Sequence, residues 1–209
     1  MEHETLIWMD YPSMFVHMKA LASRPLAVLT ILSALCLAIQ LTPRPLPNVE
    51  FTSLLVFIVG SFFGGFIGCI LGSLVMLANG FLSPWGLAGL MLPFQILGMG
   101  LVGFAGGLYG KTKKNSVVAN SIAETGILGA FLTLVYDIIT NFGVSVSLML
   151  TGVAPLPAII TSLISGAPFS LIHVGSNLLI FSATFFPLTR AMEELIGGEP
   201  EWRSEPLPT

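Results

Sequence analysis

Charged side chains are scarce in this sequence of 209 residues. Asp, Glu, Lys and Arg together make up 9% of it, whereas a soluble domain usually carries about 25%. Residues 51–110 contain none of the four. A stretch of this length is too long for a soluble core segment and matches about three membrane spans of roughly 20 residues each. The sequence therefore excludes an ordinary soluble domain and predicts an integral membrane protein.

Cysteine and basic clusters are scarce too. The two cysteines, Cys36 and Cys69, both lie within apolar stretches, which favours buried thiols over a disulfide or a metal pair. No basic stretch indicates nucleic-acid binding, because Lys111, Lys113 and Lys114 are typical of a cytoplasmic loop between membrane spans. We therefore expect no nucleic-acid partner, no metal and no cofactor.

Hydrophobic residues are abundant, at 54% of the chain, and Pro, Gly and charged residues divide them into separate segments. The expected fold is all-α, an integral membrane bundle of six transmembrane helices with approximate bounds 26–42, 51–63, 66–79, 87–109, 117–146 and 158–188. The second helix is short, because 13 residues rising about 1.5 Å each cover roughly 20 Å of a ~30 Å hydrocarbon core. The alternative is one continuous helix over 51–79, which would leave five spans.

The distribution of Lys and Arg favours six spans over five. With six spans and a cytoplasmic N-terminus, seven of the eight basic residues lie inside and only Arg44 lies outside. The best five-span arrangement places six inside and two outside. We therefore expect a multi-pass protein of the plasma membrane, surrounded by lipid, with both termini in the cytoplasm.

The chain is expected to consist of three parts. Residues 1–24 carry Glu2, Glu4 and Asp10 ahead of the first apolar run, unlike the basic start of a secretory signal, and are predicted to form a cytoplasmic or interfacial segment. Residues 25–192 form the six-helix transmembrane domain. Residues 193–209 form an acidic, Pro-containing cytoplasmic tail.

The predicted orientation gathers most polar residues of the membrane domain toward its outer side. A central Asp costs about 2.5 to 3.5 kcal/mol on insertion scales, so such groups usually face an interior or a cavity. Asp137 and Asn141 lie one helical turn apart, as do His173 and Asn177, so each pair shares a helix face. We therefore predict a binding pocket near the outer surface, with candidate residues Arg44, Asn48, Glu50, Asn79, Trp85, Gln95, Tyr136, Asp137, Asn141, His173 and Asn177.

Several of these residues have a structural alternative. Trp85 could stack on a planar ligand or be an ordinary interfacial aromatic. The two asparagines at 141 and 177 could hydrogen-bond helix to helix, and His173 could be a satisfied interior histidine. Asp137 needs a partner, such as Arg44, Tyr136 or the substrate. If these residues form a pocket, replacing Asp137, Asn141 or His173 by Ala should weaken binding without unfolding the bundle.

Small residues recur at helical spacing. Gly60, Gly64, Gly68 and Gly72 are four residues apart, and two similar pairs are Gly103 with Gly107 and Gly106 with Gly110. This spacing lets helix backbones approach closely within a membrane. The stripe could pack within one monomer or against another protein, and Thr30, Ala34 and Ala38 form a similar stripe on the first span.

Several short segments occur in an order that resembles a known family. They are Pro47–Glu50, Gly64–Gly68 followed by Gly72 and Asn79, Ser83–Gly86, Gly103–Gly107, Tyr136 with Asp137, and Ala167–Phe169 with His173 and Asn177. Over about residues 26–195 the chain resembles the S components, the substrate-binding membrane subunits, of energy-coupling factor (ECF) transporters.

This resemblance implies six helices and high-affinity capture of one vitamin-like molecule near the extracellular face. It also implies assembly with a T component and two ATPase subunits, with Ala34 and Ala38 at the partner interface. The chain has no Walker A sequence, so ATP hydrolysis would come from those partners and not from this chain. Among the S components, the chain is most similar to members associated with cobalamin or with unassigned cargo.

Two other functions fit the sequence. A small intramembrane enzyme could use Asp137 and His173 as acid and base, although no nucleophile motif accompanies them. A structural membrane subunit could use its glycine stripes to pack against other proteins.

Overall fold

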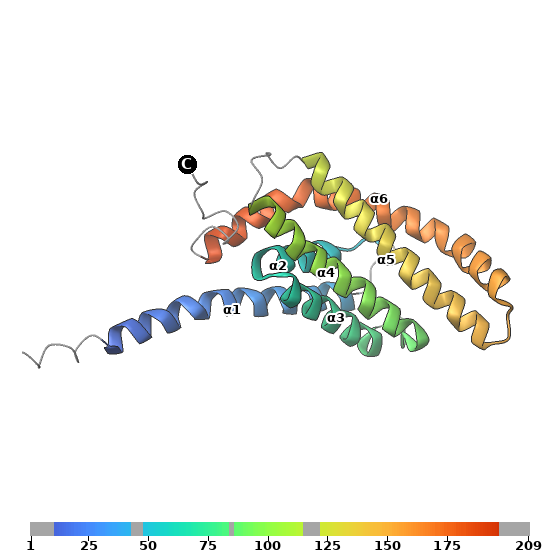
Figure 1. Cartoon of the computed structure of the whole chain (residues 1–209), viewed down its shortest axis with the longest axis horizontal. Helices are drawn as coiled ribbons and strands as arrows, with labels where there is room; N and C mark the ends of the chain where they lie inside the picture. Colours follow the sequence, from blue (N-terminus) through green and yellow to red (C-terminus); the bar gives the residue numbers. More distant parts are fainter. Residues whose placement is uncertain (1–10, 43–47, 84–85, 115–121, 197–209) are drawn as a thin grey trace, which may run out of the picture.

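The computed structural model describes residues 11–42, 48–83, 86–114 and 122–196; in residues 11–25 and 113–114 it describes the backbone alone. All secondary structure within these ranges is helical, as predicted. The elements are α1 (Tyr11–Leu41), α2 (Thr52–Phe63), α3 (Gly65–Leu82), the short 3-10 helix η1 (Gly89–Met91), α4 (Leu92–Lys114), α5 (Ile122–Leu150) and α6 (Pro155–Ile196). Figure 1 shows successive α-helices running back and forth through one bundle.

Four of these helices are long and apolar enough to cross a membrane, which indicates a membrane protein. They cover Gly65–Leu82, Gly89–Thr112, Ile122–Leu150 and Pro155–Ile196. The apolar part of α1, Leu26–Leu41, and the whole of α2 are shorter.

The region 51–79 forms two helices, not one. Gly64 separates α2 from α3 and has a φ of 95°, in the left-handed region that glycine adopts without steric cost. The short second helix is therefore confirmed, at 12 residues.

The helix ends differ from the predicted bounds at both termini. α1 runs without a break from Tyr11, so the described part of the predicted interfacial segment continues into the first apolar helix. α6 continues to Ile196, past the predicted start of the tail at 193, and residues 197–209 lie outside the described residues. The α5–α6 hairpin extends beyond the ends of α3 and α4 (Figure 1), in keeping with the lengths of α5 and α6, 29 and 42 residues.

α2 forms the centre of the bundle. Every residue from 52 to 61 is buried, and α2 contacts the other five α-helices. A helix surrounded on all sides needs no polar face, which explains its continuous apolar sequence. The Phe57 ring lies 5.4 Å from Tyr109, 5.6 Å from Phe181 and 6.0 Å from Phe185, measured between ring centroids, and so joins α2 to α4 and α6.

Glycines allow α2, α3 and α4 to pack backbone against backbone. A Cβ added at Gly60 or Gly68 would overlap the carbonyl oxygen of Gly103, and one added at Gly106 would overlap the carbonyl oxygen of Phe57. These glycine stripes therefore pack within one chain. At Gly64 the direction of a Cβ is open, with nothing within 4 Å, although its backbone lies against Gly107.

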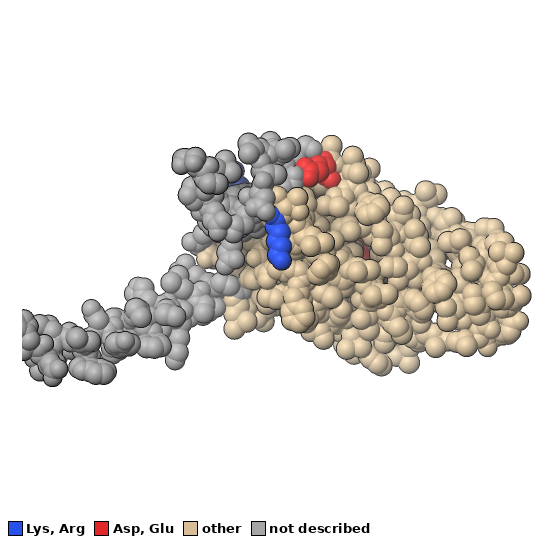
Figure 2. Space-filling model, in the orientation of Figure 1, with Lys and Arg blue, Asp and Glu red and all other residues tan. Residues whose placement is uncertain are grey.

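The outer surface of the bundle is apolar. Large hydrophobic side chains are exposed on several helices, for example Phe66 at 77% and Leu171 at 75%. Figure 2 shows a broad surface without charged side chains, and the prominent red and blue patches lie near the end of the molecule where α4 ends and α5 begins. Such a surface suits lipid better than water.

α6 changes direction as it crosses the bundle (Figure 1). It contains Pro168 and Pro187, each of which lacks a backbone N–H and so disturbs the regular hydrogen bonding of the helix. The half of α6 that precedes His173 packs mainly along α5, and this hairpin holds the candidate site described next.

Candidate functional site

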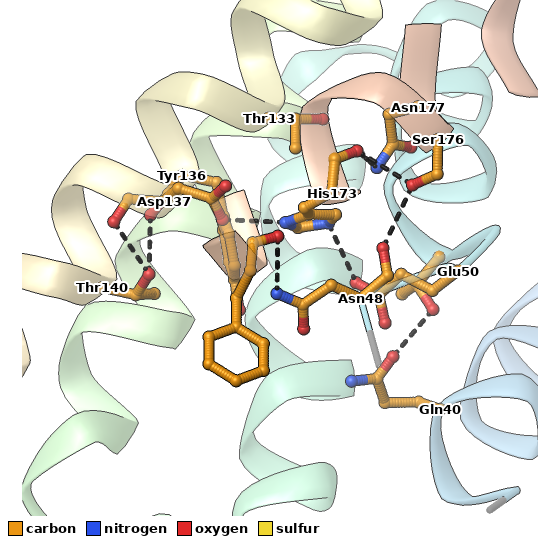
Figure 3. Close-up of polar contacts among 12 residues, drawn as sticks. Gln40, Asn48, Glu50, Thr133, Tyr136, Asp137, Thr140, His173, Ser176 and Asn177 are labelled. Carbon is orange, nitrogen blue, oxygen red and sulfur yellow. Dashed lines mark hydrogen bonds and ion pairs between the residues drawn. The ribbon is translucent and has the colours of Figure 1, made fainter. Parts of the chain in front are cut away.

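His173 of α6 lies between two carboxylates that come from different parts of the chain. Its Nδ1 is 2.8 Å from Oδ1 of Asp137 on α5, and its Nε2 is 3.7 Å from Oε1 of Glu50 (Figure 3). All three side chains are buried, with His173 at 3% and Asp137 at 6% exposure. The partner of Asp137 is therefore His173, whereas Tyr136 directs its hydroxyl at the sulfur of Met76, 3.6 Å away.

The segment that carries Glu50 is fixed to α6 by hydrogen bonds. Asn48 adopts a positive φ of 60°, which Asn tolerates better than most residues. Its side-chain amide donates to the carbonyl of Phe169 at 3.2 Å, and the Ser176 hydroxyl donates to the carbonyl of Asn48 at 3.1 Å (Figure 3). These two bonds hold Glu50 against the imidazole of His173.

Asn177 lies one helical turn after His173 on α6. Its amide nitrogen donates to the carbonyl of His173 at 3.2 Å, and the side chain is fully buried. The bond is therefore within α6 and not to a neighbouring helix, while the Asn177 Oδ1 atom has no hydrogen-bond partner among the described residues. The ring of Tyr136 meets the His173 ring edge to face, with centroids 5.9 Å apart.

The polar contacts continue to α1. The Thr52 hydroxyl, in the first turn of α2, donates to Oε1 of Gln40 on α1 at 2.9 Å. This bond joins α1 to α2 two residues after Glu50 in the chain. The group formed by Asn48, Glu50, Asp137, His173, Ser176 and Asn177 is called the His173 cluster below.

A cavity of about 320 Å³ lies between α5 and α6, next to the His173 cluster. Seven of its ten described lining residues are polar, and Asn48 and Asp137 belong to both the cavity and the cluster. Oδ2 of Asp137 is buried and has no hydrogen-bond partner among the described residues. The cavity is lined by Asn48, Asp137, Thr140, Asn141, Val144, Ser162, Ser165, Gly166, Phe169 and Ser170.

A close approach of the two helices positions Asn141 in the cavity wall. A Cβ on Gly166 would overlap the side-chain amide of Asn141, so only glycine at this position of α6 leaves room for it. Nearby, the hydroxyls of Ser145 and Ser162 are 2.5 Å apart and join α5 to α6. The cavity wall is thus held by both packing and a hydrogen bond.

The structure brings together most of the predicted site residues. Asn48, Glu50, Tyr136, Asp137, Asn141, His173 and Asn177 lie in the cluster, in the cavity wall or against the cluster. Asn79 and Gln95, both half-buried, do not line the cavity, although Oε1 of Gln95 is buried without a hydrogen-bond partner among the described residues. Arg44 and Trp85 lie outside the described residues. Ala34 and Ala38 are exposed on α1.

The sequence-based prediction missed the hydroxyl groups of the cavity. They are Thr140, Ser162, Ser165 and Ser170, and the lining also includes Phe169. Their spacing was a usable signal, because steps of three or four residues from His173 back along α6 reach positions 170, 169, 166 and 162. The same steps from Asp137 along α5 reach Thr140, Asn141 and Val144.

The chemistry available in the site is hydrogen bonding and charge. Within the described ranges, no group of three His, Cys, Asp or Glu residues is placed to hold a metal ion. No protein-family model, curated protein or solved structure matches the chain. Its function is therefore inferred from the geometry of the cavity and the cluster.

Proposed function

We propose that this chain is the substrate-binding subunit of an uptake transporter of the ECF type, which captures a small vitamin or precursor from outside the cell. The observation that carries the proposal is the polar cavity between α5 and α6, with the buried carboxylate of Asp137 in its wall. A polar cavity within an apolar membrane bundle costs free energy, so a function that uses it is the natural explanation.

In this proposal all six α-helices cross the plasma membrane and both termini are cytoplasmic. Basic residues at the end of α4 then lie inside, where they are favoured. The turn between α5 and α6 then lies outside. The cavity is lined by residues in the half of the hairpin that leads to this turn.

The proposed partners are a T component and two ATPase subunits, which would supply the ATP hydrolysis. Ala34 and Ala38 are exposed on α1 and one turn apart, so they are free to meet a partner helix. α1 is also the helix that lies at the edge of the bundle, with its N-terminal half extending away from it (Figure 1).

The size of the cavity favours a small cargo. A volume of about 320 Å³ is at the lower end of the roughly 300 to 1,000 Å³ range of small-molecule sites. Cobalamin, with its corrin ring and nucleotide loop, is far larger than this space. We therefore propose a compact polar compound in place of cobalamin.

A ligand screen tests the proposal. The full chain, purified in detergent, is heated with single vitamins and precursors, and one of them should raise the unfolding temperature. A ligand at 100 times its dissociation constant adds about 2.7 kcal/mol to the stability of the protein. Co-expression with a T component and ATPases should then give ATP-dependent uptake of the same compound.

Variants of the cavity wall test whether the compound found in this screen binds in the cavity. Asn141→Ala should weaken binding of the compound by about 2- to 10-fold, the usual range for one lost hydrogen bond. Ser147→Ala is the matched control, because Ser147 lies on the same helix, its hydroxyl donates to the carbonyl of Gly143, and it is not among the described residues that line the cavity. A folded protein that no compound stabilises would contradict the proposal.

An intramembrane enzyme is the second candidate, and the 2.8 Å contact of Asp137 with His173 is the observation that favours it. In such a dyad the carboxylate orients the imidazole, and the other ring nitrogen exchanges a proton with the substrate. Here that nitrogen, Nε2, is buried and faces Glu50, and His173 does not line the cavity. Turnover of a lipid substrate that is lost in Asp137→Asn would favour the enzyme over the transporter.

A further inference from the structure

We infer that the cavity recognises its cargo through a positively charged amine, with Asp137 as the counter-ion. The inference deepens the proposed function and rests on it. It is carried by the unpartnered carboxylate oxygen of Asp137, by the absence of Lys and Arg among the described residues that line the cavity, and by the direction of the hydrogen bonds that two of its hydroxyl groups make.

One of the two carboxylate oxygens of Asp137 makes no hydrogen bond to the described residues. Oδ1 contacts Nδ1 of His173, whereas Oδ2 is buried and has no hydrogen-bond partner within the described ranges. Asp137 itself lines the cavity, so a small movement of the cavity wall would expose Oδ2 to a ligand. A buried carboxylate oxygen without a partner is costly, and a ligand that donates to it removes that cost.

The described residues that line the cavity carry a single charge, that of Asp137. None of these ten residues is Lys or Arg. An anionic ligand would add a further negative charge next to Asp137, whereas a cation would compensate the carboxylate that is already buried there.

Two hydroxyl groups of the cavity, those of Thr140 and Ser165, present acceptors to a ligand. Thr140 donates its hydrogen to the carbonyls of Tyr136 and Asp137 on its own helix, at 3.1 Å each. Ser165 donates in the same way to the carbonyl of Thr161 at 2.8 Å. The lone pairs of these oxygens remain available to a ligand.

Asn48 follows the same pattern. Its amide nitrogen donates to the carbonyl of Phe169, which leaves the carbonyl oxygen of the side chain as an acceptor. An alkylammonium group has three N–H donors and no acceptor, so it complements a wall of acceptors around one carboxylate. A neutral alcohol of the same size would bring a single donor and would leave the charge of Asp137 uncompensated.

A panel of compounds that differ in charge tests this inference. The probes are pyridoxamine, thiamine and choline as cations, pyridoxine and nicotinamide as neutral compounds, and pantothenate, biotin and nicotinate as anions. Binding to the full chain in detergent is measured by thermal shift and calorimetry. The tightest ligand should be a cation, and pyridoxamine should bind at least tenfold more tightly than pyridoxine if either of the two binds.

Two variants separate charge recognition from folding. Asp137→Asn should weaken the cationic ligand at least about 30-fold, as expected when one member of a buried charged pair is removed. Glu124→Gln, which removes a carboxylate from the same helix outside the cavity, should leave binding unchanged. Should Asp137→Asn fail to fold, Ser165→Lys replaces it, since Ser165 is exposed at the cavity wall and a lysine there should weaken cations at least tenfold.

The outcomes are distinct. A neutral or anionic compound that binds most tightly, with an affinity unchanged in Asp137→Asn or Ser165→Lys, overturns the inference and leaves the proposed function intact. A folded protein that binds no member of the panel and none of the wider vitamin screen overturns the proposed function, and the inference with it.

Discussion

At the scale of single residues, His173 connects parts of the chain that are distant in sequence. It contacts Asp137 through one ring nitrogen and faces Glu50 with the other, and its backbone carbonyl accepts from Ser176 and Asn177. Removing the ring would leave two buried carboxylates without their shared partner and a void between α5, α6 and the segment before α2. His173 is thus part of what holds the site in shape.

The His173 ring should therefore matter for stability as well as for binding. His173→Ala should destabilise the protein by about 3 to 5 kcal/mol, the usual cost of breaking a buried ion pair. The measurement is the unfolding temperature in detergent without ligand. This differs from the sequence-based expectation that the bundle would tolerate the change. Asn141→Ala is the control, and an equal unfolding temperature in both variants would contradict the structural role of His173.

The sequence predicts those parts of the site that depend only on the spacing of residues along one helix. The one-turn spacing of Asp137 with Asn141, and of His173 with Asn177, correctly placed polar groups on the helix faces turned toward the site. The pairing of Asp137 with His173 depends on the register between α5 and α6, which is a property of tertiary packing. The serine and threonine residues were missed because such side chains in membrane helices commonly bond to their own backbone, as Thr140 does.

At the scale of helices, the close packing of α2, α3 and α4 depends on residues without a side chain. Gly103→Ala should destabilise the bundle by about 1 to 3 kcal/mol, or prevent folding, because its Cβ would overlap the carbonyl of Gly68. The matched control is Gly175→Ala, since nothing lies within 4 Å of that position on α6. Gel filtration and the unfolding temperature report the effect. Equal behaviour of the two variants would contradict the packing.

The number and order of the helices could be predicted from the apolar pattern and its breaks, including the break at Gly64. The ends of the helices could not. α6 begins at Pro155 and not at 158, because proline is well tolerated in the first turn of a helix, where no backbone donor is needed. α1 begins at Tyr11, where the sequence shows no apolar run to mark the start of a helix.

At the scale of the whole molecule, the six-span arrangement places the segments after α1 and after α3 on the same side of the membrane. In a chain with Cys36 and Cys69 replaced by Ala, Thr42→Cys and Leu87→Cys should both react with a membrane-impermeant maleimide added to intact cells. Both positions are exposed at helix ends. Thr112→Cys, near the end of α4, should react only after the cells are permeabilised. Labelling of Thr42→Cys and Leu87→Cys from opposite sides would favour five spans.

The location of the cavity in the α5–α6 hairpin has a consequence for how the ligand selectivity of the protein could change. Apart from Asn48, all the described residues that line the cavity lie between positions 137 and 170 of the chain. The glycine-packed helices α2, α3 and α4 contribute none of them. One contiguous stretch of sequence can therefore be exchanged between related chains, or varied in a library, to alter selectivity while the framework that carries it stays the same.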